Sequence, residues 1–146
     1  CSSDLPERLI SEPKCLSRPL YGFENTEHTI NNEGPYAFYY HNKIYLAYSG
    51  GDARGYLYAI GMLTANDGDD LCDLSVWEKA KTPIASFATI PGEYGPGHNS
   101  FFWDRDQNLW IAYHAVTSFE EKIVSSGMRR VYFEQDKTPR VDVIVE

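Results

Sequence analysis

Two stretches decide the fold of this chain: residues 33–49 read EGPYAFYYHNKIYLAYS, and residues 98–114 read HNSFFWDRDQNLWIAYH. When the second stretch is laid over the first without a gap, the apolar residues of their later halves coincide and Glu33 falls on His98. A repeat of this kind indicates one structural unit that is used twice. Two different polar residues at the same position of that unit indicate a shared functional location.

Composition narrows the class of protein. The 146 residues suit one domain, and a hydrophobic fraction of 42% is enough to form a core. The net charge of −8 would repel phosphate backbones, so no nucleic acid is expected as a partner. No apolar run approaches the length of about 18 residues that a membrane span needs, so none is predicted.

The three cysteines are odd in number and lack metal-ligand spacing, so neither a disulfide framework nor a zinc site is expected. Residues 1–4, Cys-Ser-Ser-Asp, resemble the start of a mature bacterial lipoprotein. The alternative is that the chain simply begins there, and we favour it because four residues specify little.

Short runs rich in aromatic and β-branched residues, separated by Gly, Asn and Asp turns, fill the chain from residue 36 onward and predict strands. No segment shows a long helical period. The predicted strands cover residues 36–40, 44–49, 56–65 and 77–84, and then 100–103, 109–115, 129–134 and 141–145, with a looser stretch at 117–126. A short strand near residues 20–23 and a helical turn near 70–75 are also expected.

Two successive four-stranded antiparallel sheets of similar sequence are typical of propeller blades. We therefore predict an all-β fold, a β-propeller fragment of about two blades. Residues 1–32 would form an irregular N-terminal arm, 33–94 the first blade and 95–146 the second. Because two blades do not close a ring, we expect missing N-terminal blades or a second copy of the chain, as a homodimer, to complete it.

Five motifs in order give the chain a family resemblance: Asn-Glu-Gly-Pro at 32–35, Ile-Tyr-Leu-Ala-Tyr-Ser at 44–49, Trp-Glu-Lys at 77–79, Gly-Pro-Gly-His-Asn-Ser-Phe at 95–101 and Tyr-His-Ala at 113–115. Together they resemble glycoside hydrolase family 43, from about residue 17 to the end. The resemblance implies a five-bladed propeller and an inverting glycosidase that acts on arabinose- and xylose-containing substrates. An oligosaccharide or plant-type polysaccharide is then the expected partner, and an extracellular or periplasmic location is favoured over a cytoplasmic one.

The resemblance also assigns roles to residues. Glu33 matches the general acid, which gives its proton to the leaving oxygen. His98 matches the histidine on the floor of the active-site funnel, which implies a Ca²⁺ ion nearby. Because calcium prefers many oxygen ligands, water would supply most of its coordination.

Three residues are candidates for substrate contact. Phe38 and Trp103 can wall a sugar pocket, with packing as the alternative for both. Arg129 and Arg130 lie where a late-blade arginine contacts substrate in some relatives, and Arg130 is the candidate. His114 is interpreted as structural.

One departure from the family pattern limits the function. The aspartates that match the general base and the third carboxylate are not found, and Asp4 is the only aspartate before Glu33. The chain is therefore expected to carry the acid without the base and to be weak or inactive unless another chain completes it. Two alternatives stay open for single residues: Glu33 as a solvated loop carboxylate and His98 as a core histidine. For the whole chain, the alternative is a non-catalytic module that binds carbohydrate or associates with itself.

Overall fold

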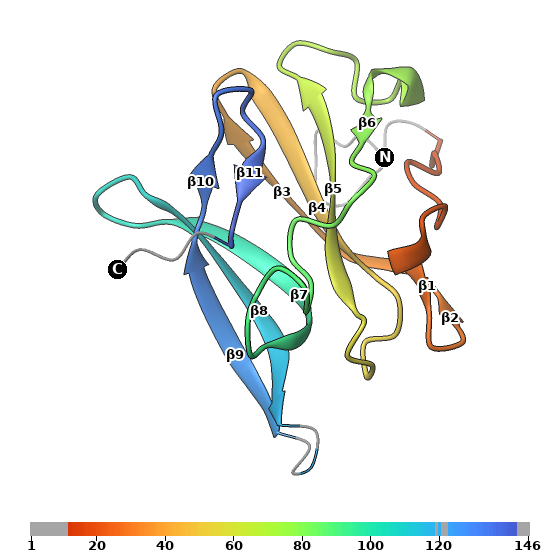
Figure 1. The fold of residues 1–146 in the computed structure, drawn as a ribbon. Helices are drawn as coiled ribbons and strands as arrows, with labels where there is room; N and C mark the ends of the chain where they lie inside the picture. The colour runs from red at the N-terminus through yellow and green to blue at the C-terminus, as the bar shows by residue number, and fades with distance from the viewer. Residues whose placement is uncertain (1–11, 119, 121–122, 143–146) are drawn as a thin grey trace.

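The computed structural model describes residues 12–118, 120 and 123–142, and they form an all-β fold with two main antiparallel sheets (Figure 1). The first sheet has the order β3-β4-β5-β6, with β3 at Asn32–Tyr40, β4 at Lys43–Gly50, β5 at Ala59–Asn66 and β6 at Glu78–Lys79. The second has the order β7-β8-β9, with β7 at Tyr94–Trp103, β8 at Leu109–Ser118 and β9 at Ile123–Arg130. No helix within the described residues could span a membrane.

Smaller elements flank the two sheets. One hairpin joins β1 (Asn25–Thr26) to β2 (Thr29–Ile30), and another joins β10 (Tyr132–Phe133) to β11 (Pro139–Arg140). Within the part of the chain that the structure describes there are two 3₁₀ helices, η1 at Gly22–Glu24 and η2 at Leu74–Val76. The strand predicted near residues 20–23 was therefore wrong, because the Glu24 carboxylate accepts hydrogen bonds from the backbone of Leu20 and Tyr21 and curls the chain into a turn.

The second sheet differs in detail from the predicted four strands. Its third strand, β9, begins at Ile123 inside the stretch that we predicted to be loose, and it ends at Arg130. β9 alternates exposed residues with small or polar inner ones, which is a weak strand signal. The chain then forms the separate β10–β11 hairpin, and most of the fourth strand predicted at 141–145 lies outside the described residues.

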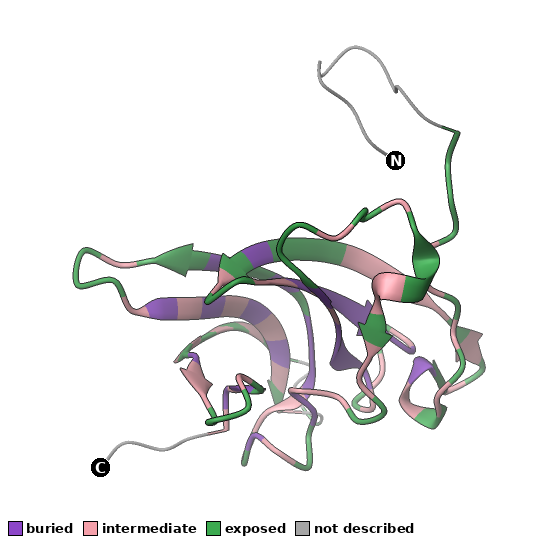
Figure 2. Cartoon of the chain, turned by 90° about the horizontal axis from the view of Figure 1, so that it is seen from above, coloured by how far each residue is buried: buried purple, intermediate pink, exposed green. Residues whose placement is uncertain are grey.

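The core lies between the two sheets, which Figure 1 shows splayed apart from a common region. Phe38 on β3 is 8% exposed and has its ring centroid 4.8 Å from that of Tyr45 and 4.5 Å from that of Phe101 on β7. In Figure 2 the buried residues follow the paired strands, whereas the connecting turns are exposed. The sheets are therefore held together mainly by aromatic packing close to the inner strands β3 and β7.

Residues 16–32 cover the face of the first sheet that points away from the second sheet. The carboxylate of Glu24, which is fully buried, anchors this segment to the sheet. Its partners are the backbone N–H groups of Leu20 (2.6 Å) and Tyr21 (2.7 Å), the Tyr48 hydroxyl (2.8 Å), the Asn32 amide (2.8 Å) and Lys79 Nζ (2.5 Å). Burial by itself would raise the pKa of Glu24, but Lys79 and the hydrogen-bond donors outweigh it and lower the pKa to about 2. Through Asn32, this carboxylate positions the residue directly before Glu33.

The buried charge of Glu24 leads to a prediction about stability and pH. The unfolded carboxyl takes up a proton near its ordinary pKa of 4.5, whereas the folded one has a pKa of about 2, so stability is lost as the pH falls through this range. Glu24→Gln should remove that pH-dependent part and leave the largely buried Lys79 side chain, 12% exposed, without its counter-charge, at a cost of about 3 kcal/mol at pH 7. Urea unfolding between pH 2.5 and 7 measures both effects, and parallel pH profiles for the two proteins would contradict them.

Packing of Phe38 gives a second prediction. Phe38→Ala should lower the free energy of unfolding by about 3–5 kcal/mol, because it opens a cavity between the sheets. The matched control is Phe102→Ala on β7, whose ring is 42% exposed and should cost less than about 1 kcal/mol. Chemical denaturation of both variants compares them, and equal losses would show that the inter-sheet contact does not stabilise the fold.

Candidate active site

Both inner strands carry a β-bulge near their start. On β3, Glu33 pairs with Ser49, and the next pair in register is Tyr36 with Ala47. On β7, the register shifts in the same way after Gly97, which pairs with His114. Within each bulge one residue has a left-handed backbone, Gly34 at φ +56° and His98 at φ +52°. Because non-glycine residues rarely adopt this conformation, and bulges are common beside active sites, His98 marks a candidate site.

The strand pairing shows that the gapless alignment of the two repeats is off by one residue in their first strands. Four residues, 40–43, separate the paired Tyr39 and Ile44 in the first hairpin, whereas five residues, 104–108, separate Trp103 and Leu109 in the second. The second turn is one residue longer, so Glu33 corresponds to Gly97 and Gly34 corresponds to His98. The predicted equivalence of Glu33 and His98 is therefore off by one residue, although both belong to equivalent bulges.

The two bulges lie against each other. A Cβ atom on Gly34 would lie 3.6 Å from Nδ1 of His98, so the imidazole packs directly on this glycine. The backbone N–H of His98 donates to Oγ of Ser49 at 2.7 Å, and Ser49 is the fully buried β4 partner of Glu33. Glu33 is half-buried and His98 is exposed, so both side chains are accessible from solvent. The structure thus brings together the two residues that the sequence singled out.

Two further side chains complete the cluster. The Tyr58 hydroxyl donates to Oε1 of Glu33 at 2.6 Å, and its fully buried ring stacks on His114 with centroids 5.6 Å apart. The His114 ring in turn stacks on that of His98 at 6.3 Å. The space for Tyr58 depends on Gly97, where a Cβ atom would lie 1.9 Å from the tyrosine ring. Sequence reasoning missed Tyr58, since a tyrosine before a strand carries no distinctive signal.

Burial and neighbouring charges tune this cluster. Burial raises the pKa of Tyr58, and its hydrogen bond to Glu33 raises it further, so the phenol stays protonated and remains a donor. Burial lowers the pKa of His114, the nearby His98 imidazole lowers it again, and the Glu33 carboxylate opposes both effects. At neutral pH the cluster therefore offers one carboxyl group beside a fixed phenol donor and a neutral imidazole.

Comparison with known proteins bears on the identity of this site. The model of glycosyl hydrolases family 43 matches residues 7–139 of the chain. The chain belongs to this family. The resemblance inferred from the motifs is thereby confirmed.

Individual family 43 relatives agree with this placement. An extracellular exo-α-(1→5)-L-arabinofuranosidase of Streptomyces avermitilis is 28% identical over 96% of the chain and 30% of its own length. The protein of the same name from Streptomyces chartreusis is 38% identical over 68% of the chain and 30% of its own length. The crystal structure of an α-L-arabinofuranosidase from Lactobacillus brevis superposes with a TM-score of 0.82 at 28% identity, covering 94% of this chain and 44% of that one. The chain thus spans about a third of the length of the two Streptomyces relatives. The structural similarity confirms the predicted fold, an all-β propeller fragment.

The calcium ion implied by the family resemblance has little support from the donor set. The described part of the chain contains no group of three or more His, Cys, Asp or Glu residues that could hold a metal ion. His98 and His114 offer ring nitrogens, whereas calcium takes six to eight oxygen ligands. These residues do not make a calcium site by themselves. A water-coordinated ion beside His98 stays a prediction, and proton transfer from Glu33 does not require it.

Asn99, next to His98, is the unexplained polar group of the site. Its side chain is buried, and neither its amide nitrogen nor its oxygen has a partner among the described residues. Buried amides are nearly always hydrogen-bonded, so a water molecule or a group outside these residues is expected to bind there.

The three residues predicted to contact substrate lie elsewhere. Phe38 is in the core between the sheets, where its role is the packing that we gave as the alternative. Trp103 is five residues beyond His98 along β7, or about 16 Å away, and Arg130 is at the same end of the second sheet. Arg129 bonds to Glu93 and Tyr113 instead. Contact of Trp103 and Arg130 with the substrate stays a prediction.

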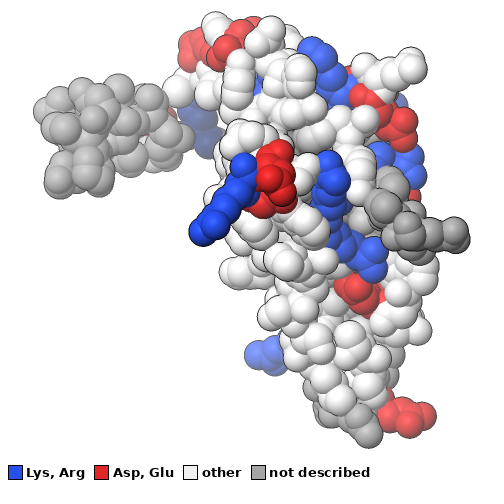
Figure 3. Space-filling model, turned by 90° about the vertical axis from the view of Figure 1, so that its left-hand side faces the viewer, with Lys and Arg blue, Asp and Glu red and all other residues white. Residues whose placement is uncertain are grey.

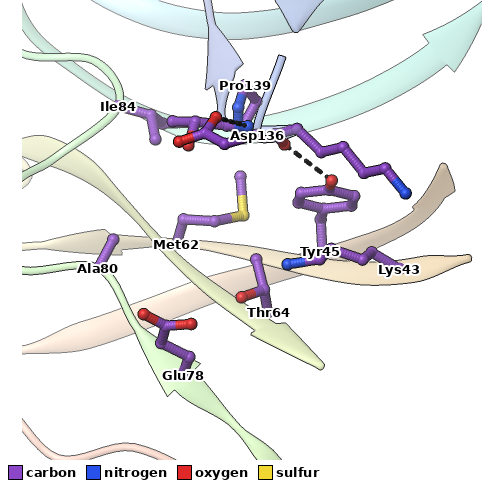
Figure 4. A pocket seen from close by; sticks show the side chains of 11 residues that line it. Lys43, Tyr45, Met62, Thr64, Glu78, Ala80, Ile84, Asp136 and Pro139 are labelled. Atoms are coloured by element: carbon purple, nitrogen blue, oxygen red, sulfur yellow. Dashed lines mark hydrogen bonds between the residues drawn. The ribbon is translucent and has the colours of Figure 1, made fainter. Parts of the chain in front are cut away.

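A pocket of about 230 Å³ also lies away from the Glu33 cluster, between the first sheet and the β10–β11 turn (Figure 4). The Tyr45 hydroxyl crosses one end of it to donate to the carbonyl of Lys137 at 2.8 Å. Glu78 and Asp136 approach it from opposite sides, as Figure 4 shows. Since it contains no predicted site residue, it is a gap beneath the hairpin and not the candidate active site.

The close fit of Tyr58 on Gly97 can be tested by substitution. Gly97→Ala should cost about 2 kcal/mol or more of stability, because the new methyl group meets the rigid tyrosine ring. Gly22→Ala is the matched control, since no atom of the described residues lies within 4 Å of a Cβ atom there. Combining Gly97→Ala with Tyr58→Ala should cost less than the sum of the two single changes in urea unfolding. If the stability losses of the two single variants were strictly additive, the Tyr58 ring would not pack on Gly97.

Proposed function

We propose that this chain supplies the acid half of an inverting glycosidase site, with Glu33 as the general acid. The observation that supports this role best is the position of Glu33: an accessible carboxyl group at a bulged strand start, bonded to Tyr58 and next to the strained His98. Because Tyr58 donates to Oε1, Oε2 is the oxygen that carries the proton toward the substrate.

The proposed reaction is the hydrolysis of one glycosidic bond. Glu33 transfers its proton to the leaving oxygen as the bond from that oxygen to the anomeric carbon breaks. A second carboxylate takes a proton from water, whose oxygen attacks the anomeric carbon from the opposite face. The product has inverted configuration, and the two carboxyl groups end with their protonation states exchanged.

The general base is assigned to a carboxylate outside the Glu33 cluster. Glu24 lies nine residues before Glu33, but it is fully buried and its oxygens are occupied by five partners, so it cannot activate water. Inverting enzymes hold their two carboxyl groups about 6.5–9.5 Å apart. We propose that another propeller blade, or a second copy of the chain, places the base at that distance from Glu33.

We propose α-L-arabinofuranosyl linkages as the substrate. The relatives from Streptomyces avermitilis, Streptomyces chartreusis and Pyricularia oryzae all have arabinofuranosidase in their names. The xylosidase of Bacillus halodurans is only 15% identical, so its similarity concerns the fold alone. Because the two Streptomyces proteins are named extracellular, we propose the same location for this protein.

Glu33→Gln tests the acid role in the active form of the protein. Hydrolysis of α-(1→5)-linked arabinotriose should fall about 10²–10⁴-fold, because its sugar leaving group needs a proton. Hydrolysis of 2,4-dinitrophenyl α-L-arabinofuranoside should fall far less, because that phenol leaves without one. Initial rates on both substrates give the ratio.

The control is Glu134→Gln, which neutralises an exposed carboxylate paired with Arg140 and should change neither rate by more than about twofold. Unchanged turnover of arabinotriose by Glu33→Gln would remove Glu33 from the mechanism. Equal losses on both substrates would assign it a role other than that of a proton donor.

A further inference from the structure

A second groove lies at the far end of the strands from Glu33, and we refer to it as the Trp103 groove. It has a volume of about 190 Å³ and is lined by Tyr40, Trp103, Gln107, Asn108, Leu109, Arg130, Val131, Tyr132 and Phe133. Tyr40 lies seven residues beyond Glu33 on β3, which corresponds to about 23 Å along the strand. The groove is therefore separate from the Glu33 cluster.

Aromatic rings form the apolar part of this groove. Tyr40 and Trp103, from the ends of the two inner strands, have their ring centroids 6.0 Å apart and their planes at 27°. Behind Tyr40, the Phe133 ring stacks at 3.9 Å and fixes its orientation. Trp103 is 42% exposed, so an open indole surface faces solvent beside a tyrosine held in place.

Polar groups beside the rings are held by a hydrogen-bond chain. Asp104 Oδ2 accepts from Trp110 Nε1 at 2.8 Å and from the Asn108 amide at 2.9 Å. The Asn108 oxygen in turn accepts from the Arg130 guanidinium, which lies over the Tyr132 ring at 5.1 Å. Hydrogen bonds from Trp110 and Asn108 lower the pKa of Asp104 to about 2, so it remains an acceptor at neutral pH. The guanidinium and amide are therefore oriented before any ligand arrives.

Open aromatic faces beside oriented planar donors suit a sugar ring. The C–H face of a sugar packs on aromatic rings, while its hydroxyl groups bond to guanidinium and amide groups. Figure 3 shows the side of the molecule that carries the β7–β8 turn, and acidic and basic side chains are interspersed there among uncharged surface. A field of one sign, as an anionic polymer would need, is not visible on this face.

We propose that the Trp103 groove binds one sugar residue of a neutral polysaccharide, at a site separate from the bond that is cleaved. The choice of an arabinan as that polysaccharide rests on the proposed function, whereas the groove itself does not. The groove would hold a polymer strand at the protein surface, and cleavage at Glu33 would not require it for a small substrate.

The experiment measures binding in the Glu33→Gln background, so that hydrolysis does not remove the probe. Linear α-(1→5)-arabinan in a native gel should retard the protein, and Trp103→Ala should weaken this binding about tenfold. Phe102→Ala is the matched control, because Phe102 has the same exposed fraction of 42% on the neighbouring position of β7 but does not line the groove. It should change the affinity by less than twofold.

A second measurement locates the ligand. The chain has three tryptophans, whose indole N–H signals are resolved by ¹⁵N NMR. Titration with α-(1→5)-linked arabinotriose should shift the Trp103 signal and leave that of Trp77 unchanged. Arg130→Gln should abolish this shift in the folded protein.

Equal affinity of Trp103→Ala and its parent, equal losses in Trp103→Ala and Phe102→Ala, or an unresponsive Trp103 signal would overturn the proposal. These outcomes are independent of the acid role of Glu33. Failure of the proposed function would appear as unchanged arabinotriose hydrolysis in Glu33→Gln, whatever the gel shows.

Discussion

The site depends on one backbone constraint: two β-bulges, one at the start of each inner strand, pressed against each other. Each bulge contains a left-handed residue, Gly34 or His98, and the imidazole of the second packs on the bare α-carbon of the first. A side chain at Gly34 would be strained by the left-handed backbone, while its Cβ atom would only touch the imidazole. For His98 the same conformation costs roughly 1–2 kcal/mol, which the surrounding structure must supply. Strain of this kind persists where it orients a functional group.

The rest of the fold supplies that support from both faces of the first sheet. On one face, Phe38 and its aromatic neighbours hold the second sheet in place. On the other face, Glu24 collects five donors and fixes Asn32, directly before Glu33. Tyr58 then links the core to the site, because its buried ring occupies the space that Gly97 leaves and its hydroxyl reaches the carboxylate. The contacts that stabilise the fold are thus the same ones that position the residues around Glu33.

Regular patterns were predictable, and exceptions to them were not. The hairpin from residue 36 to 49 follows from an alternating aromatic pattern and a turn at His41 and Asn42, which both have positive φ. β9 was missed, since its inner positions are small or polar and match no burial pattern. The one-residue shift between the repeats was also missed, because a gapless alignment cannot accommodate the extra residue of the second turn. Tyr58 could not be found, since only the folded chain places it beside Glu33.

By itself, the sequence determined the family, the all-β class and the two residues on which the candidate site is built, because spaced motifs and alternating apolar runs record local backbone preferences. Only the tertiary structure decided which side chains meet. In the folded chain Phe38 lies in the core, and Trp103 and Arg130 lie far from Glu33. Tyr58 and His114, in contrast, belong to the Glu33 cluster. The physical reason is that strand register and bulges set the sheet face on which each side chain lies and its position along the strand. A shift of one residue changes both.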